Sequence, residues 1–167
     1  MNNNGMHIEF APRGIVQVDH ARIIHRNFEG RQGEYNREGD RNFSLLIDSE
    51  EVYEALRAEG WNVKRKDPRE DGDLPLMYLP VKVRYNDRGG PRAYLLAGKK
   101  KTELDEESIA CLDDVEIDSV DLDIRPYDWE RNGKTGRTAY LLGIHVTQKI
   151  DRFAARYIDT EDDCPWN

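Results

Sequence analysis

The chain has 167 residues, of which 38% are hydrophobic and 35% charged, and this composition predicts one domain with a sizeable core and a highly polar surface. Its two cysteines, Cys111 and Cys164, form no disulfide framework and favour a reducing compartment. The first residues lack the pattern of a signal peptide, and no apolar run approaches about 20 residues, so we expect a soluble cytoplasmic protein without a membrane span.

The net charge of −8 would normally argue against a nucleic-acid partner, but the charges are unevenly distributed. Neither the acidic segment Glu103–Asp123 nor the acidic terminus Asp159–Asn167 contains Lys or Arg. The basic residues gather elsewhere, at Arg13–Arg41, Lys64–Arg69, Lys82–Lys101 and Arg125–Lys149. This segregation keeps a basic surface for an anionic partner open.

The first half of the chain predicts strands separated by a long polar loop and an inserted helix-strand unit. Gly14–Arg26 is predicted as one long or bent strand, and Arg41–Ile47 as the next. Phe28–Asp40 between them is rich in Gly and predicts a loop that is functional or mobile. The insertion begins with a helix over Ser49–Glu59, which starts at a capping-box-like Asp48 and stops at Gly60. A short strand over Trp61–Lys66 and a turn-rich loop over Asp67–Pro75 follow the helix.

The second half predicts a long strand over Leu76–Asn86, a return strand over Arg92–Ala97, a basic corner at Lys99–Lys101 and a second short helix over Asp105–Leu112. A β-hairpin over Ser119–Thr147 follows.

Alternation defines both strands of this hairpin. Val120, Leu122 and Ile124 share one face of the first strand, and the second strand repeats the pattern with Tyr140, Leu142, Ile144 and Val146. Asn132-Gly133 and Thr135-Gly136 supply residues that tolerate positive φ in the loop. Pro126 lacks an N–H group, so we expect it at a sheet edge or barrel rim.

Without the insertion and the return strand, the order is β-β-β-α-β-β, which is that of the OB-fold. We therefore predict a mainly β fold: an OB-fold-like Greek-key β-barrel over residues 1–150, with an acidic tail over residues 151–167. Phe28–Asp40 and Glu130–Gly136 then correspond to the two loops with which OB-folds grip oligonucleotides. A β-sandwich of about eight short strands is the competing architecture.

Cations and aromatic residues concentrate in these loops and the neighbouring strands. Single-stranded DNA needs cations for its phosphates and ring faces for its bases. The candidate DNA-binding residues are Arg26, Phe28, Tyr35, Arg37, Arg41, Lys82, Arg84, Arg125, Tyr127, Trp129, Lys134 and Arg137. The competing interpretation is that Phe28 and Tyr127 belong to the core and the charges to a solvated face.

The tail ends in a run of carboxylates followed by Pro-Trp. It could occupy the protein's own cationic groove as a phosphate mimic, or offer an aromatic anchor to a basic pocket of a replication or recombination protein. The residues concerned are Asp159, Glu161, Asp162, Asp163, Pro165 and Trp166. A plain solubilising tail is the alternative.

Catalytic and cofactor motifs are weak. Asp121, Asp123 and Asp128 could bind Mg²⁺ in a nuclease, but they alternate on an exposed face without a Glu-x-Lys partner. The four His and two Cys residues lack zinc-ligand spacing, and the sequence has no phosphate-binding glycine fingerprint or nucleophile elbow. We expect no enzyme activity, metal or cofactor.

Four segments, taken in order, resemble a group of bacteriophage single-stranded-DNA-binding proteins: Ala21–Gly30, Asn36–Phe43, Gly60–Lys64 and Arg125–Gly136. The resemblance spans roughly Gly14 to Thr147. It implies an OB-fold, no catalysis and a role in phage replication and recombination. The acidic tail with Trp166 is similar to the acidic, aromatic-tipped tails of such proteins.

Together these patterns predict a protein that coats single-stranded DNA with little sequence preference, in the cytoplasm of a bacterial host if a phage encodes it. A homodimer remains open. The main alternative is an accessory protein that binds a host protein through Glu103–Asp123, and a metal-dependent nuclease is the enzyme alternative.

Overall fold

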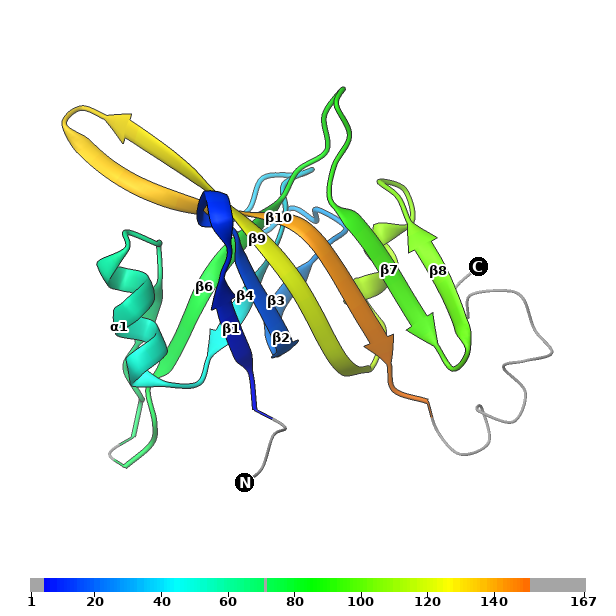
Figure 1. Ribbon diagram of the computed structural model, residues 1–167, viewed down its shortest axis with the longest axis horizontal. Helices are drawn as coiled ribbons and strands as arrows, with labels where there is room; N and C mark the ends of the chain where they lie inside the picture. Colours follow the sequence, from blue (N-terminus) through cyan, green and yellow to red (C-terminus); the bar gives the residue numbers. More distant parts are fainter. Residues whose placement is uncertain (1–4, 71, 151–167) are drawn as a thin grey trace.

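Strands form most of the structure, as the alternation of apolar and polar residues predicts (Figure 1). The computed structural model describes residues 5–70 and 72–150. Within them lie ten strands: β1 His7–Phe10, β2 Val16–Ala21, β3 Ile23–Asn27, β4 Arg41–Ile47, β5 Lys64–Lys66, β6 Leu76–Val83, β7 Arg92–Ala97, β8 Lys100–Leu104, β9 Ile117–Arg131 and β10 Lys134–Gln148. The helices of this part are α1 Glu50–Ala58 and two 3₁₀ helices, η1 Pro12–Gly14 and η2 Ile109–Asp113. None of them is long and apolar enough to cross a membrane.

The ten strands belong to one sheet with an OB-like order. Its main path is β1-β2-β9-β10-β6-β4-β3, in which β6 and β10 run parallel and the other neighbours are antiparallel. β2 and β3 are successive parts of the predicted strand Gly14–Arg26, and together they correspond to the bent first strand of an OB-fold. They lie at opposite ends of the path β2-β9-β10-β6-β4-β3, as the two halves of that first strand do in an OB-fold. Over residues 5–70 and 72–150 the sheet does not close, which differs from the predicted β-barrel. The predicted mainly β, OB-like fold is confirmed, and the two-sheet sandwich is not observed.

The core lies on the inner face of this sheet. Val120, Leu122 and Ile124, predicted from their alternation, are at most 2% exposed. The intervening positions of β9 face outward as the strand period requires. The predicted face of the second strand needs a correction, because the β9–β10 register shifts between Leu141 and Gly143. This bulge places Tyr140 on the outer face, where neighbouring side chains leave it only 7% exposed, and it leaves Leu142 39% exposed, whereas Ala139, Leu141, Ile144 and Val146 belong to the core cluster.

The inserted helix-strand unit is present, with shifted bounds. α1 is capped by Ser49, whose Oγ accepts a hydrogen bond from the Val52 N–H at 3.2 Å, so Ser49 and not Asp48 begins the helix. β5 covers only the last half of the predicted Trp61–Lys66 strand. Trp61 is instead buried, and it forms an isolated bridge with Arg137.

The predicted second helix and basic corner also differ from the prediction. Residues before Ile109 form a turn, because Oδ1 of Asp105 accepts hydrogen bonds from the N–H groups of Glu107 and Ser108 at 3.0 and 2.9 Å. Only the short η2 remains helical. Lys100 and Lys101 of the basic corner belong to β8, which pairs with β7.

The β9–β10 hairpin extends beyond the body of the protein (Figure 1). The last residue of β9 that pairs with β2 is Ile124, opposite Val16, whereas the hairpin continues to a turn at Asn132-Gly133. Both turn residues have positive φ, 53° and 78°, which is the geometry of a tight type I′ hairpin turn. We call Pro126–Thr138 the arm. The predicted hairpin and the edge position of Pro126 are confirmed, although Thr135-Gly136 belongs to β10 and not to the loop.

Candidate nucleic-acid interface

A groove of about 940 Å³ lies over β4 and β6 and beneath the Phe28–Asp40 loop. In the OB order these are the second and third strands and the loop between the first two strands, which together form the usual oligonucleotide-binding face. Five of the predicted DNA-binding residues line it: Tyr35, Arg37, Arg41, Lys82 and Arg84.

The groove floor contains aromatic residues that sequence reasoning missed. His25 contacts the ring edge of Tyr78, with 5.1 Å between ring centroids, and its Nδ1 lies 3.3 Å from Oγ of Ser44. Both rings and the Ser44 hydroxyl line the groove. Alternation in β6 could have placed Tyr78 outward, because Met77 and Leu79 on either side of it are buried.

One row of outward-facing residues runs across four strands from the groove toward the arm. Asn42 on β4 pairs with Lys82 on β6, Lys82 pairs with Tyr140 on β10, and Tyr140 pairs with Arg125 on β9. We call these four residues the cross-strand row. Because at least one strand neighbour of each (Phe43, Val81, Val83, Ala139, Leu141 and Ile124) is buried, the row lies on the outer surface of the sheet.

Tyr140 is the aromatic centre of the row, and it was not among the predicted site residues. The guanidinium carbons of Arg84 and Arg125 lie 5.5 and 4.8 Å from its ring centroid. The Tyr127 ring meets it edge-on, with 5.8 Å between centroids. These cation–π and edge contacts fix two arginines close together on the open face. The structure thus brings together the predicted Arg84, Arg125 and Tyr127.

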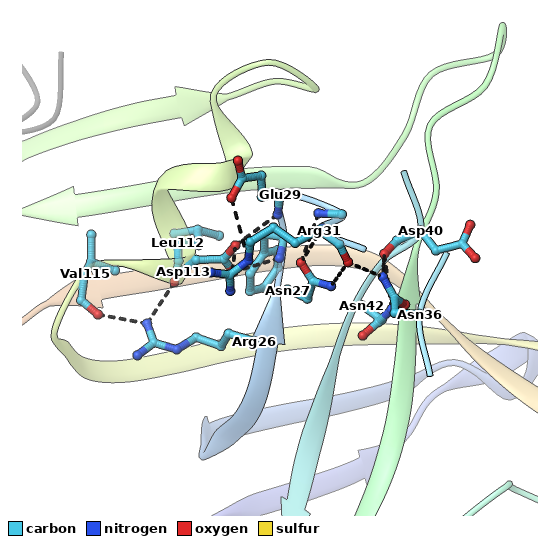
Figure 2. Close-up of polar contacts among 12 residues, drawn as sticks. Arg26, Asn27, Glu29, Arg31, Asn36, Asp40, Asn42, Leu112, Asp113 and Val115 are labelled. Atoms are coloured by element: carbon cyan, nitrogen blue, oxygen red, sulfur yellow. Dashed lines mark hydrogen bonds and ion pairs between the residues drawn. The ribbon is translucent and has the colours of Figure 1, made fainter. Parts of the chain in front are cut away.

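The Phe28–Asp40 loop is tied down by amide side chains (Figure 2). Nδ2 of Asn36 donates to the carbonyl oxygens of Arg31, Arg37 and Asp40 at 2.8, 3.1 and 3.0 Å. Oδ1 of Asn27 accepts from the N–H groups of Gly30 and Arg31 at 3.1 and 2.8 Å. These bonds satisfy the loop's backbone from within, so the loop presents a fixed surface.

Asp113 in η2 joins the start of this loop to the body of the protein (Figure 2). Its Oδ1 and Oδ2 accept hydrogen bonds from the N–H groups of Phe28 and Glu29 at 2.7 and 3.0 Å. The side chain is only 4% exposed. The loop then presents Tyr35, which is 94% exposed, at a turn closed by two hydrogen bonds between Gly33 and Asn36.

Two predicted DNA-binding residues are structural instead. Phe28 has no exposed surface and stacks on Phe43 in the core, with 5.1 Å between ring centroids, so the prediction that it stacks on bases is wrong. Nη1 of Arg26 donates to the carbonyl oxygens of Leu112 and Val115, both at 2.8 Å (Figure 2). This atom of Arg26 therefore holds η2 in place and does not face the groove.

The arm presents its residues on two faces. Trp129 is 40% exposed and covers Gly136, its cross-strand partner, whose missing Cβ leaves room for the indole ring. Lys134 is exposed beside the turn. Arg137 lies on the opposite face, where its Nε donates to Oδ1 of Asp128 at 2.7 Å and its guanidinium lies over Trp61. This hydrogen bond holds the pKa of Asp128 below its usual range. Arg137 is therefore separated from the cross-strand row.

The carboxylates considered for a nuclease site have other surroundings. Oδ1 of Asp121 accepts a hydrogen bond from the His20 N–H at 3.0 Å, and Asp128 pairs with Arg137. Burial, with Asp19 and Asp121 nearby, raises the pKa of Asp123. Among residues 5–70 and 72–150, no group of three His, Cys, Asp or Glu side chains is placed to hold a metal ion. The predicted tail residues Asp159 to Trp166 lie outside the described residues.

Fold and site together define a class: an OB-like domain whose outer face combines aromatic rings with Arg and Lys. The sequence of residues 8–163 matches the model of a family described as "Putative phage ssDNA-binding domain". The chain therefore belongs to this phage family of single-stranded-DNA-binding proteins, as the sequence resemblance predicts. No curated protein matches the sequence.

Solved structures show the same fold. The single-stranded DNA-binding protein from bacteriophage Enc34 superposes with a TM-score of 0.53 at 16% identity, covering 93% of this chain and 92% of that one. The same protein in complex with ssDNA gives 0.53 at 15% identity, covering 87% and 93%. Its C-terminal truncation gives 0.52 at 16% identity, covering 85% and 90%. At these identities the likeness concerns the fold alone.

Proposed function

We propose that the protein coats single-stranded DNA along a path that starts in the groove, crosses the sheet on the cross-strand row and reaches the arm. The continuous pairing of Asn42, Lys82, Tyr140 and Arg125 across four strands is the observation that supports this path. Lys82, Arg84 and Arg125 neutralise phosphates, whereas Tyr35, Tyr127 and Trp129 stack on bases. Because every base has a π-face, sequence preference is low.

This binding serves phage DNA replication and recombination in the cytoplasm of the bacterial host, without catalysis. Membership of a family of phage single-stranded-DNA-binding domains supports this role. A strand incubated with the protein and Mg²⁺ should stay intact. Cleavage that is lost in Asp121→Asn would instead support the nuclease alternative.

The test is a fluorescence titration of a labelled oligothymidine and of a duplex of equal length, at several salt concentrations and without metal. We expect tighter binding to the single strand. If Lys82, Arg84 and Arg125 each neutralise one phosphate, the slope of log K against log salt should be about −2.1, since each single-strand contact contributes about −0.7. Failure to bind, even after removal of the tail, would favour an accessory protein that uses Glu103–Asp123 to bind a host protein.

The acidic tail forms the second part of the proposal. Its carboxylates compete with DNA for the cationic face, and DNA binding releases the tail for a replication or recombination protein. A chain that ends at Ile158 should therefore bind oligothymidine more tightly than the full chain at low salt, and the difference should shrink as salt screens the charges. Equal or weaker binding by the shortened chain would contradict this competition.

A further inference from the structure

Arg41 and Tyr85 meet at one end of the groove. Arg41 is the first residue of β4, and Tyr85 follows the end of β6. The guanidinium carbon lies 5.4 Å from the centroid of the tyrosine ring, and both side chains line the groove. Gly90 also lies against this ring, where any Cβ would overlap it. The ring therefore packs against both an arginine and a glycine.

Two hydrogen-bond donors at this place are buried without a partner: Nε of Arg41 and Oη of Tyr85. Burial raises the pKa of Tyr85 to about 12, so its hydroxyl keeps its proton at neutral pH. Buried donors are normally satisfied, because leaving one unpaired costs free energy. A ligand with acceptor oxygens in the groove would satisfy both of these neighbouring donors.

An exposed carboxylate of the groove, that of Glu106, lies next to Arg41. Oε1 of Glu106 lies 3.5 Å from Nη1 of Arg41, and the Glu106 side chain is 60% exposed. The carbonyl oxygen of the same residue accepts a hydrogen bond from Nη2 of Arg41 at 3.0 Å. If the carboxylate swings out, the carbonyl still fixes the guanidinium. Glu106 can therefore leave without disordering the cation that it neutralises.

We propose that Arg41 and Tyr85 form a phosphate-binding subsite for an internal phosphodiester of the DNA strand, and that the Glu106 carboxylate, which pairs with Nη1 of Arg41 in the free protein, competes with this phosphate. The inference rests on the proposed function, because it assumes that the groove holds single-stranded DNA. The two non-bridging oxygens of a phosphodiester supply the acceptors that Nε of Arg41 and Oη of Tyr85 lack. Binding displaces the Glu106 side chain toward solvent.

The first test compares Glu106→Gln with Glu107→Gln, using an oligothymidine with a 5′-hydroxyl end. Both variants remove one negative charge from adjacent exposed residues, but only Glu106 contacts Arg41. Glu106→Gln should bind about threefold more tightly than the wild-type chain at low salt, because the competing ion pair is partly exposed and weak. Glu107→Gln should stay within about twofold of the wild type. Equal gains in both variants would overturn the proposed displacement, because they would reflect net charge alone.

The second test is Tyr85→Phe, which keeps the ring and removes only the hydroxyl. DNA binding should weaken about tenfold, as for the loss of a hydrogen bond to a charged group. The free protein should be as stable as the wild type or more so, because the deleted hydroxyl is buried without a partner. Unchanged binding, or a loss that merely follows a loss of stability in thermal unfolding, would overturn the subsite.

Two further comparisons complete the test. The first distinguishes an internal phosphodiester from a terminal phosphate, and the second distinguishes failure of the subsite from failure of the proposed function. A 5′-phosphate on the oligothymidine should leave the affinity unchanged. A gain that disappears in Tyr85→Phe would overturn the assignment to an internal phosphodiester. If the wild-type chain binds and the variants match it, only this inference fails. If no form of the chain binds the strand, the proposed function fails and the subsite with it.

Discussion

Replacing Phe28 with Ala is expected to lower the free energy of unfolding by about 3–5 kcal/mol, which is typical of a fully buried aromatic side chain. Phe28 has no exposed surface, and it stacks on Phe43 inside the sheet. The loop that starts at Phe28 is also anchored to η2, because the Phe28 N–H donates a hydrogen bond to Asp113. Urea unfolding monitored by tryptophan fluorescence measures the loss.

Tyr35→Ala provides the matched control in the same loop. Tyr35 is 94% exposed, so its removal should leave the free energy of unfolding unchanged. The variant should instead lose about 1–3 kcal/mol in binding to oligothymidine, which is the contribution of one stacked base. A stable Phe28→Ala variant with weakened DNA binding would reverse this assignment and make Phe28 the stacking residue.

Much of the fold follows from the sequence, because the patterns that encode it are local. Strand alternation located the buried side chains of β9, and Asn-Gly located the hairpin turn. The strand order then led to the OB-like arrangement, and this placed the Phe28–Asp40 loop over the candidate interface. The predicted Tyr35, Lys82 and Arg84 lie together in the groove as a result.

The errors arise where a side chain has a partner far away in the chain. Arg26 looked like a cation for DNA, but its Nη1 binds carbonyl oxygens of residues more than 80 positions away. Phe28 looked like a loop aromatic because nothing local shows that Phe43 lies beneath it. Strand alternation predicts Tyr140 on the inner face with Ile144 and Val146, but a single bulge at Leu142 reverses the alternation and places Tyr140 on the outer face. Tertiary contacts decide these cases.

The double variant Lys82→Glu/Arg125→Glu is expected to bind oligothymidine about 100-fold more weakly at low salt, because two phosphate contacts are lost and two repulsive charges are introduced. Both residues belong to the cross-strand row, on either side of Tyr140. The salt slope should become shallower by about 1.4, since each single-strand contact contributes about 0.7. Titration at several salt concentrations measures both quantities.

The control changes net charge equally but away from the row. Arg22→Glu/Arg57→Glu replaces two exposed arginines, one between β2 and β3 and one on α1, neither of which lines the groove. At moderate salt, charges farther away than the Debye length of about 8–10 Å are screened, so the control should approach wild-type affinity while the row variant stays impaired. Equal losses in both variants at every salt concentration would show that the protein attracts DNA only through its net charge. Such a result would remove the cross-strand row as the binding path.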